Sequence, residues 1–145
     1  MSLVAVSRDE VEALSRGETG DRPVAPGWPH DDTAAGLGFI NNGGWQFLIT
    51  DSAGRIAGEC GTKTAPRDGR VEIGYGLAAH SRGRRLGTAA VTELVGWLVA
   101  RPDVAVIEAE VHVSNAPSRR IVERLGFTAD DAPAQGYLRY RRSAE

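Results

Sequence analysis

Cysteine and lysine are among the residues that this chain contains least of. Among its 145 residues there is one cysteine, Cys60, and one lysine, Lys63, so that all but one of the 17 basic residues are arginine. A lone cysteine excludes an internal disulfide and fits a reducing compartment, which makes the cytoplasm the expected location. Because Cys60 falls in a predicted strand without a partner thiol, we expect a buried structural side chain and not a nucleophile.

Long apolar runs and a large excess of one charge are also missing. No segment approaches the length of a membrane span, and the first residues lack the basic-then-apolar pattern of a signal peptide. The 17 basic and 19 acidic residues leave a formal net charge of -2, which argues against a nucleic-acid-binding domain. The 3 histidines lack the spacing of metal ligands. We therefore expect no membrane, nucleic-acid or metal partner.

The length and the patterning predict one mixed α/β domain. A chain of 145 residues can bury roughly 68–70% of its unfolded surface, which is enough for a core of its own. Periodicity and turn residues predict helices over residues 7–16, 32–40, 87–100 and 115–125. They predict strands over residues 45–50, 55–61, 71–77, 104–113 and 137–141. The order is two short helices, a three-stranded antiparallel meander, then helix, strand, helix and strand, with a crossover helix joining parallel neighbours.

Residues 82–87, with the sequence Arg-Gly-Arg-Arg-Leu-Gly, lie between a predicted strand and the start of a predicted helix. Small residues there let the backbone approach an anion, and the first N–H groups of the helix point toward it with the helix dipole behind them. The arginines add charge that a polyphosphate would attract. This arrangement predicts a phosphate site, although a Gly/Arg turn alone is not specific.

A second motif makes the prediction specific. Asn115 is followed by Ser118 and then by Leu125-Gly126-Phe127 at the end of the next helix. With the loop, residues 71–127 resemble the GNAT superfamily of acetyl-CoA-dependent N-acetyltransferases. They look most like the branch that acetylates the N-termini of ribosomal proteins. The resemblance implies a GNAT-type fold with splayed parallel central strands, and transfer of acetyl from acetyl-CoA to a primary amine in a ternary complex.

The resemblance also implies a single acetyltransferase domain, residues 1–145, in which successive segments have different roles. Residues 1–70 would form the acceptor side and the N-terminal strands, residues 71–127 the acetyl-CoA-binding core, and residues 128–145 a closing strand. The residues matched to positions that bind the cofactor are Leu77, Ala78, Ala79, Arg82, Gly83, Arg84, Arg85, Leu86, Gly87, Thr88, Asn115 and Ser118.

One loop position departs from the family pattern. Arg85 stands where glycine is usual. Its backbone N–H can still bind phosphate if φ is negative, whereas a required positive φ would be costly for arginine.

The family's chemistry needs a base, because an ammonium has no lone pair with which to attack a thioester. Glu110 matches a glutamate that serves as base in some relatives, and Glu72 on the neighbouring strand is the second candidate. Each could equally be a solvated or ion-paired side chain. Glu108, Glu110 and His112 share one face of their strand by the period of two, so His112 could be a relay or a structural histidine.

The position of the family's proton donor is also altered. Many relatives carry a tyrosine seven residues after the asparagine, where this chain has Val122. Either Tyr75, Tyr137 or Tyr140 replaces it, or the thiolate leaves without a dedicated acid, since a free alkyl thiol has a pKa near ~8.5.

The acceptor and the partners are left open by the sequence. Trp28 and Trp45 are candidate walls of an acceptor pocket, and Asp31 and Asp32 either attract a cationic substrate or cap a helix. The amine could be a peptide N-terminus, an amino acid, a polyamine or an aminoglycoside. A non-catalytic acyl-CoA-binding or regulatory module is the alternative function, while a nucleotide-binding site lacks the Gly-Lys-Ser/Thr motif. The strand over residues 137–141 either pairs across a homodimer or is kept apart by its arginines.

Overall fold

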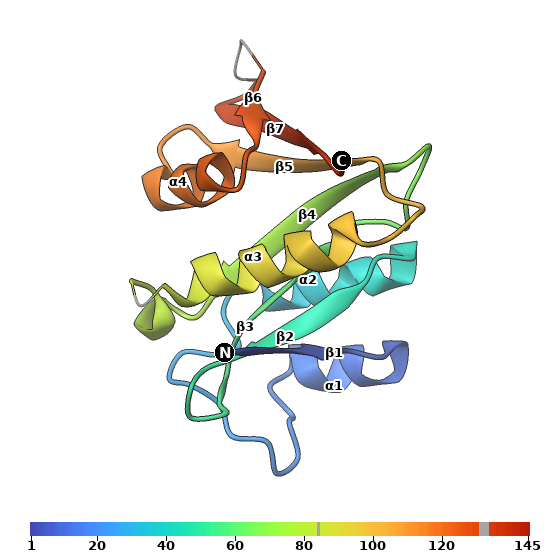
Figure 1. The fold of residues 1–145 in the computed structure, drawn as a ribbon. Helices are drawn as coiled ribbons and strands as arrows, with labels where there is room; N and C mark the ends of the chain where they lie inside the picture. Colours follow the sequence, from blue (N-terminus) through green and yellow to red (C-terminus); the bar gives the residue numbers. More distant parts are fainter. Residues whose placement is uncertain (84, 131–133) are drawn as a thin grey trace.

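A computed structural model describes residues 1–83, 85–130 and 134–145 of the protein. The described residues form a seven-stranded mixed sheet in the order β1-β2-β3-β4-β5-β7-β6 (Figure 1). The strands are β1 (Ser2–Ala5), β2 (Gln46–Thr50), β3 (Ile56–Thr62), β4 (Arg70–Leu77), β5 (Val106–His112), β6 (Thr128–Ala129) and β7 (Tyr137–Ser143). The α-helices are α1 (Val11–Ser15), α2 (Thr33–Gly38), α3 (Leu86–Val99) and α4 (Ala116–Arg124), with 3-10 turns η1 (Arg8–Glu10), η2 (Phe39–Asn42) and η3 (Ala79–Ser81).

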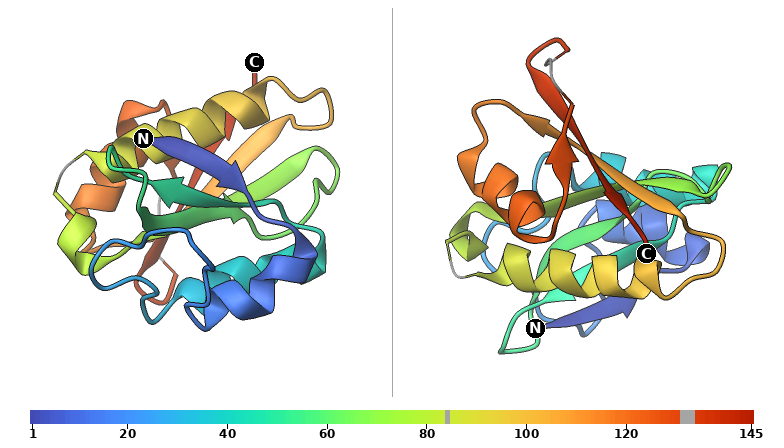
Figure 2. Two further views of the ribbon diagram at one scale, coloured as in Figure 1. Left: turned by 90° about the horizontal axis from the view of Figure 1, so that it is seen from below. Right: turned by 45° about the horizontal axis from the view of Figure 1, so that its top comes forward.

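Helices cover both faces of the sheet. Figure 2, left, shows the sheet between α3 on one side and α1 and α2 on the other. The face under α3 and α4 carries the larger hydrophobic core, which includes Val91, Leu94 and Ile107. The opposite face carries a smaller core around Leu14, Leu37 and Leu48. This mixed α/β architecture confirms the predicted fold class, because alternate residues of the central strands face different helices.

The predicted elements are present with small shifts at their ends, but two strands were missed. β1 pairs with β2 in antiparallel register, Ser2 opposite Thr50. β6 is only 2 residues long and pairs with β7. Both are too short to show a period of two, so only pairing with a longer neighbour makes them strands.

Local capping explains where two of the helices begin. The predicted capping box is formed, with the Ser7 N–H donating to Glu10 Oε1 at 3.0 Å before η1 and α1. Asp32 occupies the N-cap position of α2, but its side chain makes no capping hydrogen bond. Instead Thr33 Oγ1 accepts from the His30 N–H at 3.0 Å. Asp32 therefore stands at the predicted N-cap position without the hydrogen bond expected of its side chain.

The crossover through α3 brings β4 and β5 together as parallel neighbours, as predicted. Their ladder runs from Arg70 opposite Val106 to Ile73 opposite Ala109, and the described residues contain no pair beyond it. Farther along, β4 stays paired with β3 as far as Leu77. β5 stays paired with β7 as far as His112. The two strands therefore diverge in the middle of the sheet, which confirms the expected splay.

No helix among residues 1–83, 85–130 and 134–145 has the length and apolar character that crossing a bilayer requires.

Candidate functional site

The opening between β4 and β5 holds a cleft of about 790 Å³. Its walls come from the ends of both strands, the loop before α3, and α4. A smaller hollow of about 210 Å³ lies beside it, between α2 and the β3–β4 surface. The two cavities share Asp32, Lys63 and Tyr75 in their linings, so they lie side by side.

The backbone of β4 offers hydrogen-bonding groups to the cleft. The Ala78 N–H donates to Ala57 O at 2.8 Å, and Glu72 O accepts from the Lys63 N–H at 2.9 Å. Successive residues of a strand point their backbone groups to opposite sides, so the even-numbered residues of β4 face β3. Tyr75 and Leu77 then direct their N–H and C=O groups toward the opening, where the β4–β5 ladder has ended.

The loop before α3 forms one end of the cleft. Arg82, Gly83, Arg85, Gly87 and Thr88 all line it. Arg84, which was also predicted to bind the cofactor, lies outside the described residues.

Arg85 adopts the backbone conformation that its side chain disfavours. Its φ of 60° and ψ of 10° lie in the left-handed region, where the Cβ of an L-residue is crowded. The position therefore needs the geometry that the family obtains with glycine, and the chain retains arginine there.

The N-terminus of α3 is open toward the cleft. Arg85 is the N-cap residue of this 14-residue helix. The first N–H groups of an α-helix have no intrahelical acceptor, and no side chain of the described residues caps them here. Gly87 is buried, and a Cβ added there would come to 3.3 Å from Leu77 Cδ1, so glycine lets the helix approach β4 closely. These first N–H groups have no acceptor among the described residues, and together with the helix dipole and neighbouring guanidinium groups they fit a phosphate-bearing ligand such as coenzyme A.

Three more of the predicted cofactor residues surround this loop. Ala78 is fully buried, and its N–H is engaged by β3. Ala79 is exposed at the start of η3, and its carbonyl accepts from the Arg82 N–H at 3.3 Å. Leu86 is half-buried at the first turn of α3 and packs against the larger core.

The start of α4 forms the opposite wall. Asn115 Oδ1 accepts from the Ser118 N–H at 3.2 Å, so the predicted capping is present, and both residues also line the cleft. The Ser118 hydroxyl forms a hydrogen bond with the Tyr75 hydroxyl from β4. Burial raises the pKa of Tyr75 above its usual value, with the bond to Ser118 acting in the opposite direction. The phenol is therefore neutral and keeps its proton near neutral pH.

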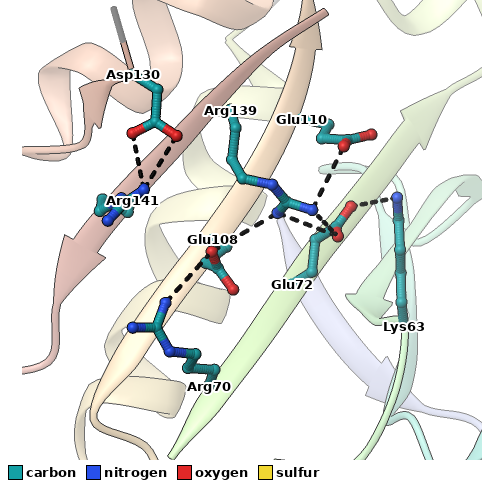
Figure 3. Close-up of polar contacts among 8 residues, drawn as sticks. All are labelled: Lys63, Arg70, Glu72, Glu108, Glu110, Asp130, Arg139 and Arg141. Atoms are coloured by element: carbon teal, nitrogen blue, oxygen red, sulfur yellow. Dashed lines mark hydrogen bonds and ion pairs between the residues drawn. The ribbon is translucent and has the colours of Figure 1, made fainter. Parts of the chain in front are cut away.

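The two predicted catalytic carboxylates lie in one network of ionic contacts (Figure 3). Glu110 lines the cleft, and its Oε1 is 3.4 Å from Arg139 Nη2. Glu72 is half-buried, pairs with Lys63, and places Oε1 at 3.3 Å from the same Arg139 nitrogen. Glu108 is 3.7 Å from Arg139 and from Arg70. One arginine from β7 thus links carboxylates from β4 and β5.

A third carboxylate, which sequence reasoning missed, lies in the smaller hollow. Glu59 is only 3% exposed. Its Oε2 is 2.7 Å from His30 Nε2, and its Oε1 accepts from Trp28 Nε1 at 3.2 Å. The signal available in the sequence was a lone charged residue in β3, a strand in which every residue is buried.

The tryptophan and cysteine predictions have different outcomes. Trp28 is 4% exposed and reaches the hollow only through its hydrogen bond to Glu59. Trp45 packs edge-on against Trp97 of α3, with ring centroids 5.0 Å apart, so its predicted place in the acceptor wall is wrong. Cys60 is buried as expected, and burial raises the pKa of its thiol to about 12.

The remaining predicted acid and relay residues are dispersed. Val122 is fully buried in the core. Tyr140 is also buried, and it donates to Glu123 Oε2 at 2.6 Å. Tyr137 and His112 line the cleft and stack edge-on against each other. Tyr75 is thus the candidate tyrosine that both lines the cleft and contacts a hydroxyl of α4.

No group of three or more histidine, cysteine or acidic side chains poised to hold a metal ion occurs in the described ranges.

Two curated proteins, both uncharacterized N-acetyltransferases, are similar in sequence to part of this chain. The chain is 30% identical to the uncharacterized N-acetyltransferase p20 of Bacillus licheniformis over 81 residues, covering 55% of this chain and 46% of that protein. It is 24% identical to the uncharacterized N-acetyltransferase YjdG of Bacillus subtilis (strain 168) over 119 residues, covering 74% of this chain and 71% of that protein. The chain thus spans less than half of p20 and about seven-tenths of YjdG.

Solved structures share the fold across nearly the whole chain. RimL, a ribosomal L7/L12 alpha-N-protein acetyltransferase in complex with coenzyme A, matches with a TM-score of 0.72 and 19% identity, over 97% of this chain and 92% of its own. A chimera of the spermidine N-acetyltransferase SpeG from Vibrio cholerae and hSSAT matches with a TM-score of 0.70 and 13% identity, over 99% and 97%. A family model described as acetyltransferase (GNAT) domain matches residues 3–128. The chain therefore belongs to the GNAT acetyltransferase family.

Proposed function

We propose that the protein is an acetyl-CoA-dependent N-acetyltransferase that moves acetyl to a primary amine by direct attack in a ternary complex. The observation that carries this proposal is one cleft that joins three elements. These are the unpaired edge of β4, the uncapped start of α3, and the Asn115–Ser118 turn of α4.

The cofactor would be held mainly by the backbone. The loop residues and the first N–H groups of α3 would bind the pyrophosphate of coenzyme A, with Arg82 and Arg85 adding charge. The Leu77 backbone would pair with the amides of the pantetheine arm, as an added strand would. A neighbouring N–H on β4 would stabilise the oxyanion that forms when the amine attacks. Bound acetyl-CoA supplies the thioester, and the chain supplies the position and the electrostatics.

Proton transfer would use groups on both walls. The reacting ammonium loses two protons in becoming an amide, and the departing thiolate takes up one. Glu110 lines the cleft with a solvent-accessible carboxylate, which supports it as the base. Glu72 is held by Lys63 and Arg139, which supports it less strongly. The Tyr75–Ser118 hydroxyl pair lies in the wall of the cleft and would return a proton to the sulfur.

The acceptor is proposed only as a class. Three likenesses point to a peptide N-terminus or a small amine. They are the resemblance to the branch that acetylates ribosomal-protein N-termini, the fold shared with RimL, and the fold shared with spermidine N-acetyltransferase.

We propose no nucleic-acid or membrane partner. Homodimer formation through β7 is disfavoured, because β7 is paired with β5 along one edge and with β6 over part of the other edge.

The test combines cofactor binding with turnover. We expect coenzyme A to bind in calorimetry, and acetyl-CoA to release free thiol with at least one member of a panel of peptides, amino acids, spermidine and aminoglycosides. Glu110→Gln should lower kcat about 100-fold, the size of a general-base contribution, with coenzyme A affinity changed less than twofold. Glu93→Gln on the exposed surface of α3 is the matched control and should leave both quantities unchanged.

Two outcomes would overturn parts of this proposal. Tight coenzyme A binding without transfer to any amine would favour the acyl-CoA-binding module. Full turnover in Glu110→Gln would remove Glu110 as the base while leaving the transferase intact.

A further inference from the structure

The hollow between α2 and the sheet exists because the facing residues of β3 and β4 are small. Glu59 is paired with Gly76, and Gly61 with Gly74, in the antiparallel register. Residues two apart on a strand share a face, so these three glycines and Glu59 all face α2. The glycines contribute no side chains, and the space of about 210 Å³ is left with the Glu59 carboxylate among its lining groups.

Glu59 is held by two donors. The Trp28 indole N–H donates to one carboxylate oxygen, and His30 Nε2 contacts the other at 2.7 Å. The Asp32 N–H donates to His30 Nδ1 at 3.2 Å, so Nδ1 acts as an acceptor and the ring hydrogen is assigned to Nε2. With that tautomer His30 Nε2 donates to Glu59 Oε2. The carboxylate is therefore buried and fixed in position by two ring N–H donors.

The other charged residues that line the hollow do not pair with Glu59. Asp32 adds a second carboxylate to the lining. Lys63 also lines it, but the Lys63 ammonium is paired with Glu72. A buried carboxylate is costly unless it is paired and hydrogen-bonded, so this site favours a ligand that brings a positive charge.

The hollow adjoins the cleft in which acetyl transfer would occur. Gly76 lines both the hollow and the larger cleft. A Cβ built on Gly76 would lie 2.9 Å from Glu59 Oε2. The carboxylate therefore lies directly over the strand that borders the β4–β5 opening.

We propose that Glu59, held by Trp28 and His30, is the carboxylate that binds the ammonium group of the acceptor. This inference rests on the proposed function and assigns it an acceptor class, a primary amine that arrives as a cation with its –CH2–NH3⁺ end in the hollow. His30 and Trp28 are positioning residues, because they act through Glu59. Proton removal remains with the base described above.

A binding experiment tests this assignment without turnover. ¹³C-methylammonium is titrated into the protein with coenzyme A present and followed by NMR, with methanol as the neutral probe. We expect saturable binding of methylammonium and none of methanol. Glu59→Gln keeps the shape and one accepting oxygen but removes the charge, and should weaken methylammonium at least tenfold. Glu93→Gln is the matched control and should bind as the wild type does.

Trp28→Phe gives a second, independent variant. It removes the indole donor but keeps the carboxylate, so methylammonium should bind several-fold more weakly than in the wild type while His30 still holds one oxygen. If Glu59→Gln does not fold, as judged by circular dichroism and coenzyme A binding, Trp28→Phe decides the question. Unchanged methylammonium affinity in whichever variant is folded, or equal binding of methanol, would overturn the proposal.

Kinetics separate this inference from the proposed function. With a cationic acceptor, Glu59→Gln should raise KM at least tenfold and lower kcat less than Glu110→Gln does. An unchanged acceptor KM would overturn the role of Glu59 and leave the transferase standing. If methylammonium binds through Glu59 but the protein transfers no acetyl to any amine, the role of Glu59 stands and the proposed transferase function is overturned.

Discussion

Arg85 shows how much one backbone angle can cost at a binding loop. Its φ of 60° lies where an L-residue other than glycine loses roughly 1–2 kcal/mol. The resemblance to the family identified the substitution of arginine for glycine, but the sign of φ depends on how the loop turns between η3 and α3. The guanidinium lines the cleft, so the strain is retained at a position where charge can contact a phosphate.

Arg85→Gly should therefore stabilise the protein and weaken the cofactor. Relief of left-handed strain, less the greater backbone freedom of glycine when unfolded, leaves an expected gain of about 0.5–1 kcal/mol in the free energy of unfolding. Arg85→Ala is the matched control, because it removes the same charge but keeps the Cβ. Urea unfolding should separate the two variants, and calorimetry should show weaker coenzyme A binding in both. A glycine variant no more stable than the alanine variant would contradict the assigned strain.

At the scale of elements, the paired strands β3 and β4 line the hollow opposite α2, and their glycines leave room there for a ligand. A Cβ on Gly74 would meet only Lys63 Cε at 3.8 Å, an ordinary contact. On Gly61 it would lie 2.0 Å from Trp45 O, so that glycine is required by the fold. The two positions look alike in the sequence, and only the segment packed against each glycine distinguishes them.

Gly74→Val should close the hollow without damaging the sheet. Valine favours extended backbone and meets no close backbone atom there, so stability should not fall. We expect acceptor KM to rise at least fivefold and coenzyme A affinity to change less than twofold, measured by steady-state kinetics and calorimetry. Gly96→Ala, at an exposed position of α3 with no atom within 4 Å of the added Cβ, is the control that should leave the acceptor KM unchanged. If Gly74→Val instead lost coenzyme A, the hollow would belong to the cofactor side.

At the scale of the whole molecule, packing and charge join two halves of the sheet across the opening. The β4–β5 ladder holds only its first part together, and α3 packs over the larger core on one face. On the other face Arg139 of β7 reaches Glu72 of β4. The cleft is thus a gap within one continuous sheet, whose two halves are joined by the first part of the ladder and by the Arg139–Glu72 contact.

The buried thiol of Cys60 should make the stability of the whole fold depend on alkaline pH. Its folded pKa is raised from 9.0 to about 12, so the thiol stabilises the fold fully below pH 9 and loses that contribution as the pH rises from 9 toward 12. Between pH 8 and 10 this group should remove about 1.4 kcal/mol from the free energy of unfolding. Denaturant unfolding of Cys60→Ala over the same range should show a decline smaller by that amount. Parallel declines in the two proteins would show that the thiol is not the cause.

The sequence by itself determined the order of the longer elements, the anion loop and the capped start of α4, but not the short strands β1 and β6. These features depend on periodicity and on hydrogen bonds between residues close in the chain, as in the Asn115–Ser118 cap. Only the tertiary structure decided which distant groups meet. Trp28 and Glu59 are 31 residues apart, Tyr75 and Ser118 43, and Glu72 and Arg139 67. A period of two assigns a side chain to a face of the sheet, but strand order and loop path decide what lies against it. The resemblance to the family named Glu110 and Glu72 as candidate bases, whereas the Glu59 site depends on how α2 folds over β3.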